Sequence, residues 1–154
     1  MKIEEEIQQT KFRNPYHKVA INLLFTAGWL DDRNKEYFKL FGLTPQQFNI
    51  LRILRGQHPG KISVTEIKSR MLDKNSDVSR LVSRLISKEF IIKSQSPKDK
   101  RAADIHITEP GLEVLKKIDS KMDQIDVRLL KLTREEAGQL NFLLDKSRGL
   151  FSTN

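Results

Sequence analysis

The clearest pattern along the chain is an apolar stripe between residues 76 and 89. Its members recur at intervals of three and four residues: Val78, Leu81, Val82, Leu85 and Ile86. This spacing is typical of an amphipathic α-helix that buries one face. Serine and arginine residues fill most of the remaining positions. The pattern predicts a helix over 76–89, with Asn75 or Ser76 as its N-cap.

Capping signals mark the starts of other helices. Thr44 is followed by a proline and, three residues on, by Gln47, which together form a capping box. Residues 63–66 and 133–136 repeat the capping-box pattern, and Thr108 precedes Glu-Pro. We therefore expect helices over about 14–41, 45–56 and 64–72, a helix that begins after Thr108, and a last helix that carries Leu140, Leu143 and Leu144.

The hydrophobic period changes after residue 90. Ile-Ile-Lys-Ser-Gln at 91–95 and Ala-Asp-Ile-His-Ile-Thr at 103–108 are typical of two strands. They enclose the turn Ser-Pro-Lys-Asp-Lys-Arg at 96–101. We expect a β-hairpin with a positively charged tip, and a short extended segment at Ile62-Ser63.

Further along, apolar residues follow a coiled-coil-like spacing of three and four: Leu115, Ile118, Met122, Ile125 and Leu129. This seam also fits an ordinary contact within one chain. We favour a dimer contact because the long first helix and the last two helices exceed what one small core can cover.

The order of three helices and a basic hairpin indicates a mainly α (α+β) fold, the winged helix-turn-helix, with N- and C-terminal dimerisation helices. We expect a dimerisation helix in 1–42, a DNA-binding lobe in 43–110 and dimerisation helices in 111–154.

Charge supports this interpretation. The 154 residues carry a net charge of +8, and +6 of it lies between Leu43 and Pro110. This excess predicts an anionic partner, with nucleic acid first and an anionic membrane second. The longest nearly uncharged stretch, 19–30, is too short to span a bilayer, and the N-terminus is not of the signal-peptide type. A cytoplasmic protein with no membrane partner is expected.

Catalytic chemistry finds no support in the residue types. The chain has no cysteine, and its three histidines are far apart without metal-ligand spacing. Neither an activated nucleophile nor a paired acid and base is evident. We expect a protein that is not an enzyme and that uses no cofactor or metal.

Duplex DNA is the partner that this arrangement fits. An α-helix or a two-stranded ribbon fits the major groove, and short hydroxyl side chains do not hold a helix out of it. The helix 76–89 would present six candidate contacts: Ser76, Asp77, Ser79, Arg80, Ser83 and Arg84. The hairpin tip would place Lys98, Lys100 and Arg101 in an adjacent minor groove. Alternatively, these side chains form an ordinary solvated surface.

Two motifs resemble the MarR family of winged helix-turn-helix regulators. One is Ser-Asp-Val-Ser-Arg-Leu-Val at 76–82, followed by Phe-Ile-Ile at 90–92. The other is Asp-Lys-Arg-Ala-Ala-Asp-Ile-His-Ile-Thr at 99–108, followed by Gly111. The resemblance implies that Arg101 is a minor-groove arginine and that Asp99 orients it by a charge-assisted hydrogen bond. Asp99 also fits a turn residue that neutralises its neighbours. Glu89-Phe90 departs from the Lys-Gly usual in the family, and the loop 56–60 is longer than usual.

The resulting hypothesis is a sequence-specific, ligand-responsive repressor that binds a pseudo-palindromic operator as a homodimer. The resemblance implies a small lipophilic or aromatic effector. Two alternatives stay open. One is a winged-helix protein–protein interaction module, and the other is a transcriptional activator without a small-molecule effector.

Overall fold

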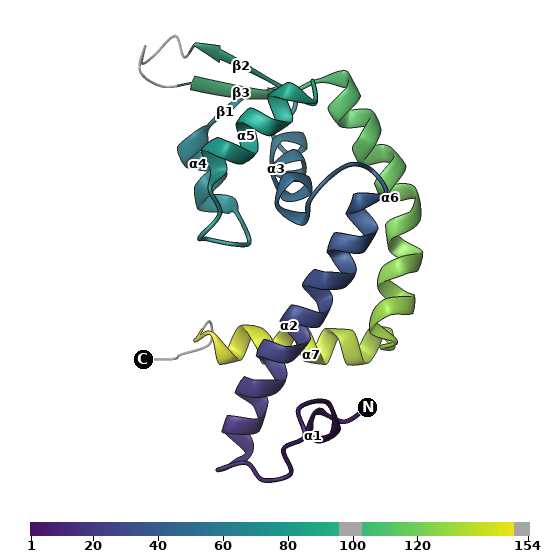
Figure 1. Cartoon of the computed structure of the whole chain (residues 1–154). Coiled ribbons are helices and arrows are strands. Elements are labelled where there is room, and N and C mark those ends of the chain that lie inside the picture. Colours follow the sequence, from purple (N-terminus) through teal and green to yellow (C-terminus); the bar gives the residue numbers. More distant parts are fainter. Residues whose placement is uncertain (96–102, 150–154) are drawn as a thin grey trace. The chain divides into compact units, whose positions relative to one another are not determined.

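The structure is a computed structural model that describes residues 1–95 and 103–149. It divides into two compact units, Met1–Leu115 and Lys116–Asn154. Ten elements follow one another along the chain: α1 (Ile3–Glu6), α2 (Pro15–Lys39), α3 (Pro45–Arg55), β1 (Ile62–Ser63), α4 (Val64–Arg70), α5 (Val78–Ser87), β2 (Ile91–Gln95), β3 (Ala103–Ile107), α6 (Glu109–Leu130) and α7 (Arg134–Ser147) (Figure 1).

The predicted helices and strands are confirmed to within about two residues at each end, which is the ordinary uncertainty of element boundaries. The four-residue helix α1 was not predicted, because its Ile-Glu-Glu-Glu sequence is too short to show an apolar period. One cap was predicted wrongly. Asp77, rather than Asn75 or Ser76, is the N-cap of α5.

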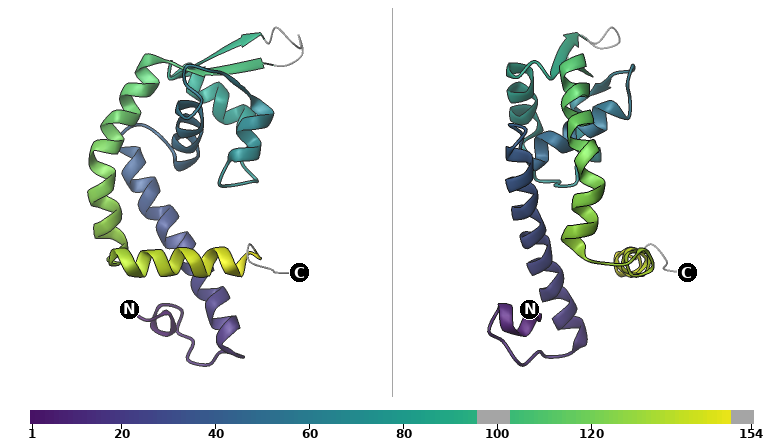
Figure 2. Two further views of the ribbon diagram at one scale, coloured as in Figure 1. Left: turned by 180° about the vertical axis from the view of Figure 1, so that it is seen from behind. Right: turned by 90° about the vertical axis from the view of Figure 1, so that its right-hand side faces the viewer.

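A three-stranded antiparallel sheet of order β1-β3-β2 lies at one end of the first unit. Its register pairs Ile62 with Ile105 and Ile91 with Ile107, so that all four side chains point to the same face and are buried. Helices α3, α4 and α5 lie on this side of the sheet (Figures 1 and 2). Each buried side chain of this size stabilises the fold by about 1.5–3 kcal/mol. The core of the lobe is therefore closed by the chain itself.

Helix α2 is anchored to this core at its C-terminal end. The Phe38 ring stacks on the Phe48 ring of α3 with their centroids 4.2 Å apart. Gly42 then takes a positive φ of 67°, which lets the chain turn into α3. Further toward its N-terminus α2 exposes large apolar side chains: Tyr16, Val19, Leu23, Leu24 and Phe25. The helix therefore carries an apolar surface that the described residues of the first unit leave open.

The second unit consists of the later part of α6 and of α7. Ile118 of the predicted seam is buried, as is Leu115 just before the unit begins. Helix α7 starts with the predicted capping box, in which the Thr133 hydroxyl accepts a hydrogen bond from the Glu136 backbone N–H at 3.2 Å. Its Leu140, Phe142 and Leu143 are exposed. Within the described residues, the helices are all too short or too polar to cross a membrane.

Candidate nucleic-acid interface

Helix α5 has one buried face and one open face. Val78, Val82 and Leu85 are buried in the lobe, as the apolar stripe predicts. Four of the predicted contact residues project from the open face and are exposed: Ser79, Arg80, Ser83 and Arg84. The amphipathic pattern thus determines which side of α5 is available to a partner.

The start of α5 is held by two aspartates. The Asp77 carboxylate accepts a hydrogen bond from the Arg80 backbone N–H at 3.1 Å, which caps the helix. Upstream, the Ser76 hydroxyl donates to the Asp73 carboxylate at 3.1 Å, and Ser76 is half-buried. Both predicted residues therefore have a local role in the turn before α5. Their contact with DNA stays a prediction.

The serine hydroxyls on α5 differ in what they can still do. Ser83 donates its proton to the Ser79 carbonyl oxygen at 3.0 Å, and Ser87 donates to the Ser83 carbonyl at 3.1 Å. Ser83 can therefore only accept a further hydrogen bond, for example from a base amino group. The Ser79 hydroxyl has no hydrogen-bond partner in the described part of the chain, so it can both donate and accept.

The two arginines on α5 carry uncompensated charge. Neither the Arg80 nor the Arg84 guanidinium forms an ion pair with any residue in 1–95 or 103–149. Both line a surface hollow of about 290 Å³, together with Asp77, Leu81 and residues from the start of α3. A guanidinium without an internal partner can bind a guanine edge or a phosphate.

The hollow is also lined by Thr44 and Gln46 at the start of α3, neither of which was predicted to contact DNA. Thr44 caps α3 by accepting a hydrogen bond from the Gln47 N–H at 3.2 Å. The first N–H groups of a helix favour anionic groups such as phosphates. The capping box marks this helix end in the sequence. What the sequence does not show is that the end lies beside Arg80 and Arg84.

The strands of the predicted wing are confirmed, since β2 and β3 pair antiparallel from Ile91↔Ile107 to Gln95↔Ala103. Four predicted site residues of the tip, Lys98, Asp99, Lys100 and Arg101, lie outside the described residues. Their assignment as DNA contacts and as an orienting pair stays a prediction.

Polar contacts hold the strands of the wing on the face of the sheet opposite the core, near the last register pair, Gln95↔Ala103. The Lys61 ammonium lies 2.6 Å from the Asp104 carboxylate. Asp104 is buried, with only 9% of its surface exposed. That oxygen has no partner in hydrogen-bond geometry within the described chain, so the contact is an ion pair. Ser94 and His106 form a hydrogen bond across β2 and β3 at 3.1 Å. These contacts hold the strands that lead to the tip.

The link between α5 and the wing contains a strained residue. Glu89 takes a positive φ of 60°, a region that side chains other than glycine rarely adopt. The Thr108 hydroxyl donates to the Glu89 carbonyl at 2.7 Å and accepts from the Gly111 N–H at 3.3 Å, as expected for the cap of α6. The turn between α5 and β2 therefore forms although Glu89-Phe90 replaces the Lys-Gly that is usual in the family.

Within the described residues, histidines, aspartates and glutamates do not gather into a group that could hold a metal ion. The site consists of a helix face with hydroxyls and free guanidiniums, flanked by a second helix start and a two-stranded ribbon. This arrangement can bind a polyanion and distinguish base edges, and it offers no nucleophile beside a base.

Comparison with known proteins gives three findings. A family model described as "MarR family" matches residues 43–103. YkoM of Bacillus subtilis (strain 168), an HTH-type transcriptional regulator, is 31% identical over 116 residues, which are 71% of this chain and 70% of YkoM. MdtR of the same organism, an HTH-type transcriptional repressor, is 33% identical over 95 residues, 62% of this chain and 60% of MdtR.

Among solved structures, a mutant MarR from E. coli complexed with operator DNA superposes with a TM-score of 0.75 at 24% identity. The match covers 90% of this chain and 99% of that one. At this identity the likeness shows the fold.

Proposed function

The chain belongs to the MarR family of DNA-binding transcriptional regulators, which are not enzymes, and from this premise we propose that it is a homodimeric, ligand-responsive repressor of a pseudo-palindromic operator. The observation that carries the proposal is the open face of α5, where Arg80 and Arg84 project without an ion pair to any residue that the structure describes.

Helix α5 would enter the major groove N-terminus first. Arg80, in the first turn, would then address the O6 and N7 atoms of a guanine, and Arg84 would meet the phosphate backbone. Ser79 and Ser83 would accept from base amino groups, while Ser76 and Asp77 would lie at the helix end that enters deepest. Thr44 and Gln46 at the start of α3 would add a phosphate contact.

The wing would supply the second set of contacts. Lys98, Lys100 and Arg101 would reach the neighbouring minor groove, with Asp99 orienting Arg101. The confirmed pairing of β2 with β3, and the ion pair of Lys61 with Asp104 on β3, support this proposal because they give the wing a stiff stem.

Dimerisation would use residues 1–42 and 111–154, outside the lobe 43–110. The exposed apolar side chains on α2 and on α7 support this assignment, because burying them against a second copy removes apolar surface from water. A two-fold axis would present two α5 helices to successive major grooves, about 10 base pairs apart.

Relief of repression would come from a small lipophilic or aromatic effector that binds between the dimer region and the lobe. The dimer would have two states, one in which the spacing of its two lobes fits DNA and one in which it does not. The effector must bind the second state more tightly than the first. The protein would act in the cytoplasm, where bacterial promoters are accessible, and repress by blocking polymerase.

The test is a salt titration of operator binding, with the operator found by footprinting on the protein's own promoter. Arg101→Ala should flatten the dependence of log K on log salt, because each phosphate contact contributes a slope of about −0.9. Arg80→Ala should reduce affinity for the operator by about 1–3 kcal/mol and leave binding to unrelated DNA nearly unchanged. Arg134→Ala on α7, which removes the same charge outside the lobe, serves as the control.

If both lobe variants bind like the Arg134→Ala control, α5 and the wing do not contact DNA. If the wild type binds all duplexes equally, the alternative of a protein–protein module is favoured, since the basic face would then suit an acidic protein. Increased transcription on operator binding would favour the activator.

A further inference from the structure

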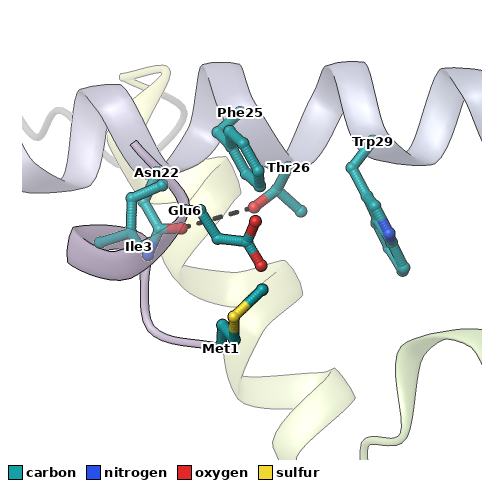
Figure 3. A pocket seen from close by; sticks show the side chains of 7 residues that line it. All are labelled: Met1, Ile3, Glu6, Asn22, Phe25, Thr26 and Trp29. Atoms are coloured by element: carbon teal, nitrogen blue, oxygen red, sulfur yellow. Dashed lines mark hydrogen bonds between the residues drawn. The ribbon is translucent and has the colours of Figure 1, made fainter. Parts of the chain in front are cut away.

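An asparagine in the middle of α3 joins this helix to the turn before α5. The Asn49 side-chain oxygen accepts a hydrogen bond from the Leu72 backbone N–H at 2.9 Å, although the two residues are 23 positions apart. Asparagine is a poor residue for a helix interior, because its side chain competes for backbone hydrogen bonds. Asn22 of α2 shows a local arrangement, in which the amide oxygen accepts from Thr26 of the same helix (Figure 3). Asn49 instead connects two elements of the lobe.

The bond forms where the chain leaves helical geometry. Met71 ends α4 with a ψ of 140°, and its N–H donates to the Lys68 carbonyl oxygen. The next N–H, that of Leu72, donates to Asn49 in place of a backbone carbonyl. This bond is exposed, so water can replace it and satisfy the same N–H. Its loss therefore costs little stability and mainly removes the direction that the bond gives to the turn.

Local hydrogen bonds extend this attachment to the start of α5. The Asp73 carboxylate accepts from the Ser76 hydroxyl at 3.1 Å, and the Asp73 carbonyl oxygen accepts from the Ser76 N–H at 3.3 Å. The Asp77 carboxylate then accepts from the Arg80 backbone N–H at 3.1 Å. The turn and the first residues of α5 therefore move as one unit, and Asn49 joins that unit to α3.

Two buried side chains hold the ends of the same unit. Met71 precedes the turn and Val78 follows it, and both are buried in the lobe. Two fixed points still allow a rotation about the line between them, and the bond to Asn49 supplies a third point that prevents it. Gln46 lies one helical turn before Asn49 on the same side of α3 and lines the hollow that contains Arg80. The third point is therefore close to the DNA-binding face.

The orientation of α5 affects two kinds of DNA contact differently. A bidentate contact from Arg80 to a guanine needs two hydrogen bonds aligned at the same time. Attraction between a guanidinium and the phosphates tolerates small displacements, since it does not depend on the position of a base. An α5 that can tilt therefore loses discrimination between base sequences before it loses affinity for DNA in general.

We propose that Asn49 is a positioning residue for DNA recognition, which sets the orientation in which α5 presents Arg80 by holding the Leu72 N–H. This role rests on the proposed function, because it requires that α5 reads base edges. Asn49 acts through the turn and not by contact with DNA. Its loss lowers the preference for the operator and leaves general affinity for DNA in place.

The test measures binding of the full-length protein to the operator and to an unrelated duplex of equal length at one salt concentration. Asn49→Ala should weaken operator binding by about tenfold and keep binding of the unrelated duplex within about twofold of the wild type. Alanine favours a helix more than asparagine does, so α3 stays folded. The melting temperature should stay close to that of the wild type, whereas a merely structural role would lower it.

A rescue variant and a matched control accompany this variant. Asn49→Asp keeps an oxygen for the Leu72 N–H, and its negative charge weakens binding of both duplexes alike. The ratio of the two affinities should therefore return to the wild-type value. Asn75→Ala makes the same substitution within the turn, at a side chain without a hydrogen bond to any residue in 1–95 or 103–149. It should keep the wild-type ratio.

Amide hydrogen exchange, followed by NMR, tests the contact in the protein without DNA. Exchange of the Leu72 N–H should become about tenfold faster in Asn49→Ala and should keep the wild-type rate in Asn49→Asp and Asn75→Ala. The Ile67 N–H within α4 is the internal reference and should exchange at one rate in all four proteins. An unchanged rate for Leu72 in Asn49→Ala would show that Asn49 does not hold the turn.

The binding data separate this proposal from the proposed function. A wild-type protein that binds both duplexes equally would overturn the proposed function, and this proposal with it. A wild-type preference for the operator that persists in Asn49→Ala would overturn the positioning role alone. The same conclusion would follow if Asn49→Ala weakened binding of both duplexes equally, or if Asn49→Asp failed to restore the ratio.

Discussion

The DNA-binding lobe and helix α2 use similar apolar residues in opposite ways. In the lobe, Leu51, Ile67 and Leu85 are fully buried by neighbours in the same chain. On α2, Leu24 is 76% exposed, although burying a leucine stabilises a protein by about 1.5–3 kcal/mol. The core of the lobe, with Phe38 at the end of α2, is therefore complete within one chain, while the part of α2 nearer its N-terminus has an apolar surface that a second chain can cover. We therefore assign DNA recognition to the lobe and dimer assembly to α2.

The largest effect is expected from a charge placed on α2. Leu24→Glu should convert the dimer into a monomer of 17.9 kDa and abolish operator binding at low concentration, because a dimer would have to bury the new carboxylate. The measurement is molar mass by light scattering. Leu72→Glu is the matched control, since Leu72 belongs to the lobe and is 85% exposed. A dimer that persists in Leu24→Glu would remove α2 from the interface.

The second prediction tests how tightly the lobe is packed. Gly111→Ala would place a Cβ atom 2.3 Å from the Phe90 carbonyl oxygen, a backbone atom that cannot move without shifting the turn after α5. We expect a loss of about 1–3 kcal/mol in the free energy of unfolding. Gly56→Ala is the control, because its Cβ would lie at an ordinary 3.5 Å from the nearest atom. Equal stability of the two variants in urea would contradict this packing.

A third prediction separates the two roles of Asp77. Asp77→Ala removes the cap of α5 and should cost about 1 kcal/mol in stability. Asp77→Asn keeps an oxygen for the Arg80 N–H, so its stability should match the wild type. It also removes a negative charge beside the DNA phosphates and should bind DNA more tightly. Weaker binding by Asp77→Asn would instead indicate that the carboxylate accepts from a base.

A smaller gain is expected at Glu89, where the backbone is strained. Glu89→Gly relieves a left-handed conformation that costs about 1–2 kcal/mol in a residue with a Cβ, but glycine loses about 0.5–1 kcal/mol through greater freedom in the unfolded chain. A net rise in melting temperature is expected in calorimetry. A lower melting temperature would show that the Glu89 side chain stabilises the turn.

The smallest effect concerns two capping boxes, one at the start of α4 in the lobe and one at the start of α7. Backbone and side-chain hydrogen bonds from Ser63 lower the pKa of Glu66, and those from Thr133 lower the pKa of Glu136. A lowered folded-state pKa means that the stabilisation is present above the ordinary pKa and is lost as pH falls through the folded value. Stability should thus decline below about pH 4.5. Glu66→Gln and Glu136→Gln should each make that decline shallower in urea unfolding between pH 3 and 6.

Local patterns in the sequence were sufficient for most of the fold. The apolar stripe from Val78 to Ile86 and the capping box at Thr44 depend on residues that are close in sequence, so they predict helices without knowledge of the rest. The choice of Asp77 as the cap could not be made this way, because Asn75, Ser76 and Asp77 are all good caps and the packing of Val78 decides between them.

The rest of the site depends on contacts between distant residues. Lys61 and Asp104 form an ion pair that joins β1 to β3, and no local pattern connects them. The same holds for Thr44 and Gln46, which reach the DNA-binding face only because α3 packs beside α5.

Hydroxyl-radical footprinting on the protein's own promoter tests the central claim most directly. Two lobes that each insert α5, joined by helices outside the lobe, should protect two patches centred about 10 base pairs apart and related by two-fold symmetry. Arg80→Ala should raise the protein concentration that protects both patches by about 5- to 150-fold, and by the same factor for each patch. A single asymmetric patch, or two patches that Arg80→Ala protects at the wild-type concentration, would contradict the assignment of recognition to α5 and of assembly to the flanking helices.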